Sequence, residues 1–195
     1  SMFNIIFLGD SITAGADLIN GYTQLLRQKC LTSNVFINNL GTAAANTHQL
    51  LQLVNNSLFN QFFPKQTHLV IIQIGTNDAN SLGQSGTLGI TLEQYKLNLK
   101  SILMNLQDRT NDILLSYPPP VSHLFKAEQD KKVTKITQII KDVAKEFNIQ
   151  TVDIRSQLLS AEAIWSDGLH LNDLGNKRMF ETILEFLQSN NLCKQ

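Results

Sequence analysis

The fold is decided by the stretch Phe3-Asn4-Ile5-Ile6-Phe7-Leu8-Gly9-Asp10-Ser11-Ile12-Thr13. Its first half is a short, mostly apolar run, which is typical of a strand covered on both faces. Its second half places a serine where such a strand leaves its sheet. Open α/β sheets bind their ligands at the carboxyl ends of their strands. The stretch therefore predicts an α/β fold with Ser11 at its functional edge.

Strand-like and helix-like segments alternate along the rest of the chain. Four further apolar runs predict strands at 35–37, 69–74, 113–115 and 149–154. Apolar residues at helical spacing predict helices over 18–31, 46–60, 91–106, 133–147 and 172–189. The first of these helices is expected to begin near Leu18, and the last is expected to bury Leu174. Five strands alternating with helices predict a parallel sheet in a three-layer α/β/α sandwich, without determining the strand order.

Length and composition limit the class of protein. The 195 residues, 43% of them hydrophobic, are enough for one domain spanning 1–195 with a substantial core. Sixteen basic residues balance sixteen acidic ones, so no nucleic-acid partner is expected. The longest apolar runs are far too short for a membrane span, which predicts no integral membrane segment. Nothing in the composition indicates a particular oligomeric state.

The termini and the cysteines carry the prediction of location. Cys30 and Cys193 are isolated near opposite ends of the chain, so neither a metal site nor a disulfide framework is expected from them. The chain enters its first strand without a basic segment or a cleavage signal, and Ser1 is typical of a tag remnant before a native Met2. We therefore expect no signal peptide and a cytoplasmic location, unless the chain is a trimmed precursor.

Four polar loops follow the predicted strands and would meet at one edge of a parallel sheet. They hold Asp10-Ser11, the segment 39–47, the tetrapeptide Gly75-Thr76-Asn77-Asp78 and the segment 165–170. Acyl transfer needs a hydroxyl nucleophile, a base within hydrogen-bond reach and a group that orients the base. It also needs donors aimed at the developing oxyanion.

The residues of these loops fit those roles. Ser11 can be the nucleophile and His170 the base. The three-residue offset between Asp167 and His170 lets a turn fold the carboxylate back onto the imidazole. The Asn77 amide can donate to the oxyanion, together with the N–H groups of Ser11 and of the loop near Ala44. These residue types at these places predict an acyl-transfer site.

Each signal also has a structural alternative. A Gly-Asp-Ser sequence at a strand end often forms only a turn and a helix cap. Asn77-Asp78 is more often a turn, and the Asp167/His170 pair could lie on the surface. His48 and His68 are expected to have structural or surface roles, and His123 is a possible pocket wall. The joint placement of the signals favours the functional interpretation.

Three of the motifs, in order, resemble the GDSL-type SGNH hydrolase family. Gly9-Asp10-Ser11-Ile12-Thr13 resembles its first signature, and Gly75-Thr76-Asn77-Asp78 its third. Asp167-Gly168-Leu169-His170-Leu171-Asn172 resembles its last. The similarity runs from about residue 3 to the end of the final predicted helix.

The resemblance implies a flavodoxin-like sandwich with a five-stranded parallel sheet. It implies a serine hydrolase that cleaves esters or thioesters through an acyl-serine, with no cofactor and no metal. Ser11 would be the nucleophile and an oxyanion donor, Asn77 would donate its amide, His170 would be the base and Asp167 would orient it.

The second signature departs from the family pattern, which usually has a glycine as an oxyanion donor. Alignment from Asn39 places Ala44 at that position, and Gly41 is the alternative register. An alanine still has the N–H, so the donor survives if the backbone conformation there suits a residue with a Cβ.

The expected activity is that of an esterase or lysophospholipase-like enzyme acting on a small acyl ester with a short to medium chain. Apolar residues on the loops 79–90 and 117–127 are expected to line its pocket, together with residues 14–22; they are Leu82, Ile90, Tyr117, Val121, Leu124 and Phe125. Three alternatives stay open: an acetyl-sugar esterase, a non-catalytic binding module, and a metal-dependent phosphoesterase. The last would use Asp10, Asp78, Asp167 and His170 as ligands.

Overall fold

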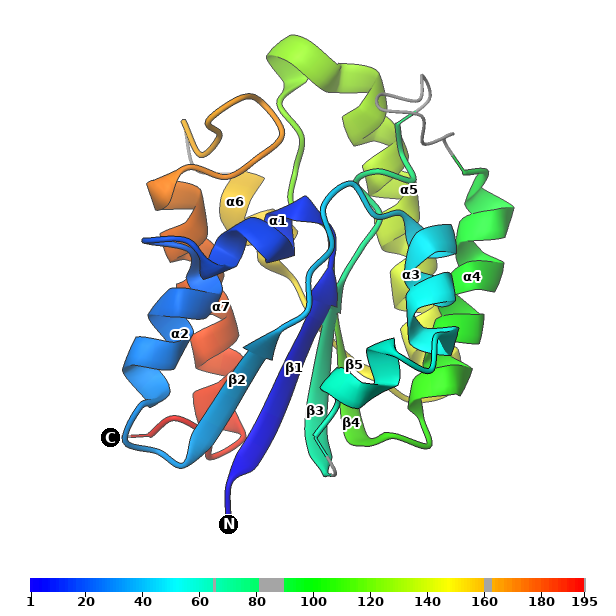
Figure 1. Ribbon diagram of the computed structural model, residues 1–195. Coiled ribbons are helices and arrows are strands. Elements are labelled where there is room, and N and C mark those ends of the chain that lie inside the picture. The colour runs from blue at the N-terminus through cyan, green and yellow to red at the C-terminus, as the bar shows by residue number, and fades with distance from the viewer. Residues whose placement is uncertain (65, 81–89, 160–162, 195) are drawn as a thin grey trace.

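The strand β1 (Phe3–Gly9) lies between two parallel neighbours in a five-stranded sheet (Figure 1). The computed structural model describes residues 1–64, 66–80, 90–159 and 163–194, without the side chains of 123–126. The other strands are β2 (Val35–Asn39), β3 (Thr67–Gln73), β4 (Thr110–Ser116) and β5 (Gln150–Val152). All pair in parallel, in the order β2-β1-β3-β4-β5. The predicted sheet is confirmed, and its order is that of flavodoxin-like folds.

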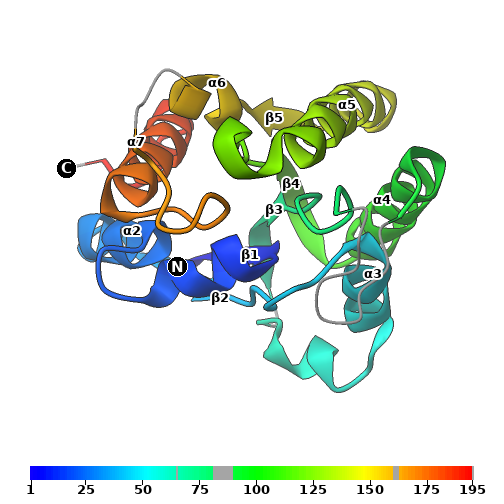
Figure 2. The ribbon, with the colours of Figure 1, turned by 90° about the horizontal axis from the view of Figure 1, so that it is seen from above.

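Helices cover both faces of the sheet, which completes the predicted three-layer sandwich (Figures 1 and 2). On one face pack α3 (Thr47–Asn55), α4 (Leu92–Leu106) and α5 (His123–Phe147). On the other pack α1 (Ser11–Ala14), α2 (Tyr22–Cys30), α6 (Ile154–Leu159) and α7 (Asp173–Ser189). Two short 3₁₀ helices, η1 (Gly15–Asp17) and η2 (Phe59–Phe62), lie in the connections.

The residues of β1 alternate between the two cores. Ile6 and Leu8 pack against the α3, α4 and α5 layer, whereas Ile5 and Phe7 pack against the opposite layer. Successive side chains of a strand point to opposite faces, and both faces are buried here. This is the physical reason for the apolar run that opens the chain.

Several element boundaries and the burial of one side chain differ from the sequence prediction. The helix expected over 46–60 ends at Asn55, and the helix expected over 133–147 begins ten residues earlier, at His123. The helix expected over 18–31 begins only at Tyr22, because η1 comes first, and Leu18 is exposed between them. Leu174 is also exposed on the first turn of α7, contrary to prediction. The strand expected over 149–154 ends at Val152, because the Asp153 carboxylate accepts a hydrogen bond from the Ser156 N–H and starts α6.

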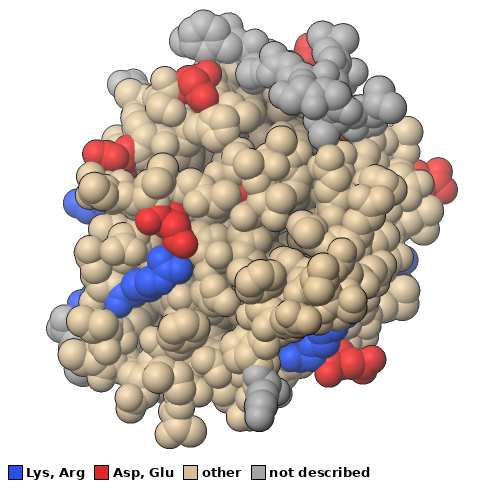
Figure 3. Space-filling model, viewed as in Figure 1, with Lys and Arg blue, Asp and Glu red and all other residues tan. Residues whose placement is uncertain are grey.

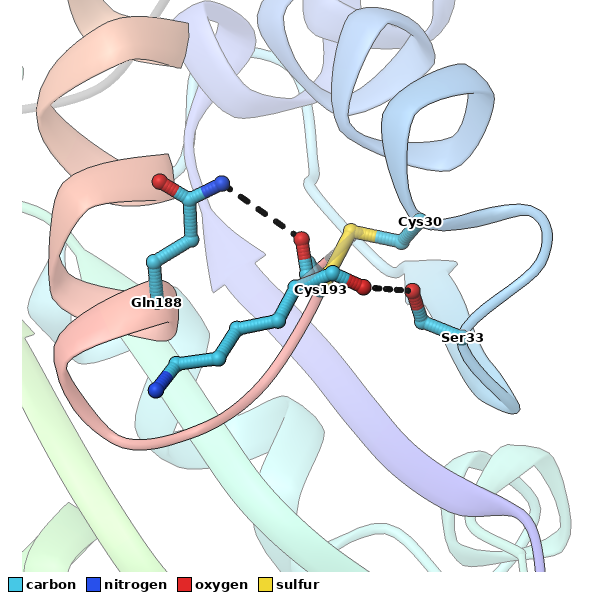
Figure 4. Close-up of a disulfide and its surroundings, with 5 residues drawn as sticks. Cys30, Ser33, Gln188 and Cys193 are labelled. Carbon is cyan, nitrogen blue, oxygen red and sulfur yellow. Dashed lines mark hydrogen bonds between the residues drawn. A yellow bond between two sulfur atoms is a disulfide. The ribbon is translucent and has the colours of Figure 1, made fainter.

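The two cysteines correct the sequence prediction, because Cys30 and Cys193 form a disulfide (Figure 4). Cys30 ends α2, and the chain after α7 turns back so that the two Cα atoms lie 4.7 Å apart. The Ser33 hydroxyl donates to the carbonyl of Lys194, which holds the same tail. A sequence separation of 163 residues hid this proximity, since only the packing of α2 against α7 brings the ends together.

Figure 3 shows how charged side chains are distributed over one face of the molecule. Charged side chains are scattered there, and neither sign forms a continuous patch. Among the described residues, no helix combines the length and apolarity needed to cross a membrane.

The disulfide should stabilise the fold, because a cross-link between residues so far apart restricts the unfolded chain. We expect the double variant Cys30→Ser, Cys193→Ser to lose about 2–5 kcal/mol in free energy of unfolding. Urea denaturation of the oxidised protein and the double variant measures this loss. Equal stability of the two, or two free thiols in the unreduced protein, would contradict the disulfide.

Candidate active site

Ser11 occupies the first position of α1, directly after the carboxyl end of β1. Gly9 allows this tight exit, because a Cβ at that position would lie 2.3 Å from Thr13 Oγ1. Asp10 then caps the helix, since its carboxylate accepts a hydrogen bond of 2.9 Å from the Ile12 N–H. The turn leaves Ser11 half-buried at the edge of the sheet.

The structure brings Ser11 together with His170 and Asp167. Ser11 Oγ lies 2.9 Å from His170 Nε2, and His170 Nδ1 lies 2.6 Å from Asp167 Oδ2. An ionised carboxylate only accepts hydrogen bonds, so the proton between these two groups belongs to Nδ1. The free lone pair of Nε2 then faces the Ser11 hydroxyl. This arrangement can transfer a proton from the serine to the imidazole.

Asp167 is held in its ionised form. Partial burial opposes ionisation, but hydrogen bonds from the His170 ring, the His170 N–H and the Leu169 N–H outweigh it and lower the Asp167 pKa to about 2. The two N–H groups donate to Oδ1 at 2.7 and 2.9 Å, while Oδ2 faces the ring. The turn predicted from the three-residue offset is therefore present, and it presents a charged acceptor to the imidazole.

The segment 164–172, which we call the histidine loop, is a hairpin. Its two arms are joined by the bond from the Ser166 N–H to the His170 carbonyl and by the bond from the Asn172 N–H to the Ile164 carbonyl, each 2.9 Å long. Gly168 lies near its tip with φ of 86°, a conformation that favours glycine. The hairpin thus carries both members of the Asp167–His170 pair on one short element.

Asn77, in the turn after β3, has its side chain oriented by the neighbouring loop. Its Nδ2 donates to the Ala45 carbonyl at 2.9 Å. A carboxamide has two N–H donors, so one remains for another acceptor. This bond also fixes the loop after β2 against the loop after β3, which places Asn77 beside Ala44 and Ala45.

The conformation of Ala44 bears on the second oxyanion donor. Ala44 has φ of 61°, in the left-handed region where the related glycine would be unstrained. The alternative donor, the Gly41 N–H, already donates to Asn39 Oδ1 at 2.9 Å. In the part of the chain that the structure describes, no protein group accepts a bond from the Ala44 N–H. The geometry therefore favours the register that assigns Ala44.

Two residues that position these loops were missed or misassigned from the sequence. Asp78, considered only as a metal ligand, is buried and accepts bonds from the Thr47 N–H at 3.2 and 3.0 Å and from the Thr47 hydroxyl at 2.5 Å. Asn39 donates to the Thr13 carbonyl at 2.6 Å, which ties the loop after β2 to α1. Their signal was position alone: a short polar side chain at the end of β2 and another in the turn that follows β3.

The residues that the structure describes offer no ligand set for the metal-dependent alternative. Within the described ranges, no three His, Cys, Asp or Glu side chains are grouped so that they could hold a metal ion. Both oxygens of Asp78 are engaged by Thr47, and Asp10 is fully buried.

Most of the predicted apolar walls are elsewhere or outside the described residues. Tyr117 and Val121 are buried in the core, contrary to prediction. Tyr117 also lines a hollow beside α5 and α6, but Ser11, Asp167 and His170 are not among the residues that line this hollow. They were misassigned because an apolar residue after a strand fits a core and a pocket wall equally well. Leu82 and the side chains of Leu124 and Phe125 lie outside the described residues. Ile90 is partly exposed.

The remaining histidines lie apart from this site or outside the described side chains. His68 accepts a hydrogen bond of 2.9 Å from the Asn4 N–H and stacks on Phe3, which confirms a structural role. His48 is exposed on α3, as a surface residue is expected to be. The side chain of His123 falls among those that the structure does not describe.

Asp10 belongs to a buried polar group behind Ser11. Burial raises the pKa of Asp10 to about 7, although the hydrogen bond from the Ile12 N–H and the nearby Gln73 side chain oppose the rise. Thr13 donates to Gln73 Oε1 at 3.3 Å, and the Tyr22 hydroxyl donates to Thr13 Oγ1 at 2.9 Å. We therefore interpret Asp10 as a structural residue of the turn that carries Ser11.

Comparison with known proteins links this chain to one family. The profile described as the GDSL-like Lipase/Acylhydrolase family matches residues 7–178. The chain is 29% identical over 162 residues to a GDSL esterase/lipase of Oryza sativa subsp. japonica, covering 73% of this chain and 62% of that protein. It is 27% identical over 198 residues to an acetylxylan esterase of Xylanibacter ruminicola, covering 90% of this chain and 41% of that protein. The chain thus spans less than two thirds of either relative.

The fold is also found in solved structures. A member of the lipolytic protein G-D-S-L family from Veillonella parvula superposes with a TM-score of 0.79 at 19% identity, covering 95% of this chain and 98% of that one.

The raised pKa of Asp10 predicts a pH-dependent cost of folding. Between pH 3.8 and about pH 7, Asp10 binds more protons in the folded chain than in the unfolded chain. The contribution of Asp10 to the free energy of unfolding therefore falls as the pH rises through this window. At about 1.4 kcal/mol per pKa unit the loss reaches up to about 4 kcal/mol. Asp10→Asn, which is neutral throughout, should therefore gain stability relative to the unsubstituted protein from pH 4 to pH 8.

Urea denaturation at both pH values tests this prediction. Asp108→Asn, at an exposed position, is the matched control and should show no such gain. A constant difference between Asp10→Asn and the unsubstituted protein at both pH values would show that Asp10 is already ionised in the folded state.

Proposed function

The chain belongs to the GDSL-like lipase/acylhydrolase family, and from this premise we propose that it is a serine esterase that hydrolyses carboxylic esters or thioesters through an acyl-Ser11 intermediate. The observation that carries the proposal is the pair of hydrogen bonds from Ser11 Oγ to His170 Nε2, 2.9 Å, and from His170 Nδ1 to Asp167 Oδ2, 2.6 Å.

In the first half of the reaction His170 Nε2 takes the hydroxyl proton as Ser11 Oγ attacks the carbonyl carbon of the ester. The carbonyl π electrons move to the oxygen and form a tetrahedral oxyanion. When this intermediate collapses, the bond to the leaving alcohol breaks and His170 returns the proton to the alcohol. Asp167 keeps the imidazole in the required tautomer and stabilises the imidazolium.

In the second half, water takes the place of the serine. His170 removes a proton from the water, which attacks the acyl carbon, and the bond from the carbon to Ser11 Oγ breaks as the proton passes to Oγ. The Ser11 and Ala44 N–H groups and the Asn77 amide would donate to the oxyanion in both halves. His170 must begin neutral, so acid should slow the reaction.

The acyl group that fits this proposal is short to medium in length. Of the six predicted wall residues, Ile90 alone keeps a partly exposed side chain within the described part of the chain. The length of the acyl group therefore stays part of the proposal, to be decided with a series of esters, since a long chain would need a continuous apolar lining.

A second candidate is an acetyl-sugar esterase, and one observation favours it. A hollow of about 300 Å³ lies beside Ala44 and is lined by Thr42, Ala43, Ala45, Gln49, Gln52, Leu53 and Asn56. Three carboxamides and a hydroxyl, with no charged group among these residues, suit the hydroxyl groups of a sugar. The acetylxylan esterase relative supports the same alternative.

The cytoplasmic location stays a prediction. The Cys30–Cys193 disulfide weighs against it, because the cytosol keeps most protein thiols reduced.

The central role assigned to Ser11 is tested by substitution. Ser11→Ala should lower kcat for nitrophenyl acetate by at least about 10³-fold, because no hydroxyl remains to form the acyl-enzyme. Asn77→Ala should lower it by about 10²-fold through loss of an oxyanion donor. Ser57→Ala, at an exposed position, is the control and should keep full activity. Full activity of folded Ser11→Ala would refute the mechanism.

The substrate is tested with nitrophenyl esters from acetate to octanoate and with acetylated xylo-oligosaccharides. The esterase proposal predicts turnover of acetate and butyrate esters and little of octanoate. If the sugar is the substrate, Gln52→Leu should lower kcat/KM for the acetylated sugar by about tenfold, a loss of about 1.4 kcal/mol for one hydrogen bond. Hydrolysis of nitrophenyl acetate should be unchanged, and Gln138→Leu, on the distant helix α5, should affect neither.

A further inference from the structure

Asp130 and Arg155 form a buried ion pair away from the reacting groups. Arg155 Nη2, on α6, lies 2.9 Å from Asp130 Oδ2, on α5, and also donates to Thr134 Oγ1 at 2.9 Å. The two residues are 3% and 7% exposed. Burying charges is costly even when they are paired, and apolar residues often serve stability as well. The position of this pair therefore calls for a role beyond packing.

The second oxygen of Asp130 holds the connection between β4 and α5. Asp130 Oδ1 accepts a hydrogen bond of 2.9 Å from the Val121 N–H. The three residues before Val121 are prolines, which have no N–H, so Val121 carries the first donor after them. We call residues 117–122 the proline segment. Asp130 thus fixes this segment to α5 at Val121.

The proline segment in turn contacts the histidine loop through two hydrogen bonds. The Ser122 N–H donates to the Gly168 carbonyl at 2.9 Å, and Trp165 Nε1 donates to the Pro120 carbonyl at 2.9 Å. On the histidine loop, the acceptor Gly168 and the donor Trp165 both lie within five residues of His170. The adjacent Val121 and Ser122 therefore connect the ion pair on one side to the histidine loop on the other.

The loop needs such support because its functional side chains are not enclosed. The side chains of His170 and Asp167 are 43% and 54% exposed, so packing alone does not fix the imidazole. A displacement of about 1 Å at a reacting group can cost about 10²-fold in rate. The contacts of the proline segment are therefore placed to set the distance between His170 and Ser11.

We propose that Asp130, held by Arg155, is a positioning residue that fixes the Asp167–His170 pair against Ser11 through the proline segment. This inference rests on the proposed serine-esterase function. It predicts a loss in kcat without a matching change in KM when the acceptor at residue 130 is removed. It also predicts a change in the fluorescence emission of Trp165. This residue is the single tryptophan of the chain, so its emission can be measured without a label.

Two double variants separate positioning from the stability of the ion pair. Asp130→Asn with Arg155→Met removes both charges but leaves a carbonyl oxygen to accept the Val121 N–H. Asp130→Leu with Arg155→Met removes the same charges and the acceptor as well. We expect the first to keep most of the kcat and the second to lose about 10–100-fold. The Trp165 emission should shift to the red, with stronger acrylamide quenching, in the second alone.

A third variant tests the same proposal if Asp130→Leu with Arg155→Met does not fold. Ser122 has φ of −58°, which proline adopts without strain, so Ser122→Pro deletes the N–H that donates to Gly168. It should lower kcat about tenfold and change the Trp165 emission. Glu146→Gln, which breaks the exposed ion pair with Lys100, is the control and should change neither.

Equal kcat in the two double variants, or a loss of kcat with unchanged Trp165 emission, would overturn the proposal. Failure of the proposed function looks different, because Ser11→Ala would then keep its activity. If only the positioning proposal is wrong, Ser11→Ala is still inactive, but Asp130→Leu with Arg155→Met and Ser122→Pro both remain fully active.

Discussion

The parallel pairing of β1 with β2 and β3 is the constraint on which the rest of the structure depends. Phe7 lies opposite Asn39, and Leu8 lies opposite Ile72, so the three strands end at one edge of the sheet. The loops that carry Ser11, Ala44 and Asn77 are neighbours for this reason. His170 follows β5 at the far side of the sheet and must reach back on a hairpin. The site therefore combines three groups placed by the sheet with one pair placed by a loop.

Short polar side chains, buried or partly buried, hold these loops in place. Asp78 binds the start of α3 through Thr47, Asn39 binds α1 through the Thr13 carbonyl, and Asp130 binds the proline segment. The two carboxylates supply acceptors to the Thr47 and Val121 N–H groups, which have no partner within a helix or strand. Burial makes these contacts strong, and it also raises the pKa of Asp78 to about 6, because a buried carboxylate loses its hydration.

Features that depend on near neighbours in the sequence were predictable, and features that depend on packing were not. The apolar run of β1 and the turn from Asp167 to His170 could be predicted because their pattern lies within a few residues. The sheet order, the Cys30–Cys193 bond and the Asp130–Arg155 pair each join distant segments, so no local pattern carries them. Tyr117 and Val121 were assigned to the pocket and lie in the core, because apolarity alone does not distinguish the two. The roles of the site residues stay predictions.

The central claim is that His170 activates Ser11 for attack on an acyl carbon. Peptide mass spectrometry after reaction with a serine-directed phosphonate tests it most directly, since the probe records which hydroxyl is nucleophilic. We expect one adduct on the peptide that contains Ser11, formed at least about 10³-fold more slowly in folded His170→Ala. An adduct at another residue, or equal labelling rates in the two proteins, would contradict the account.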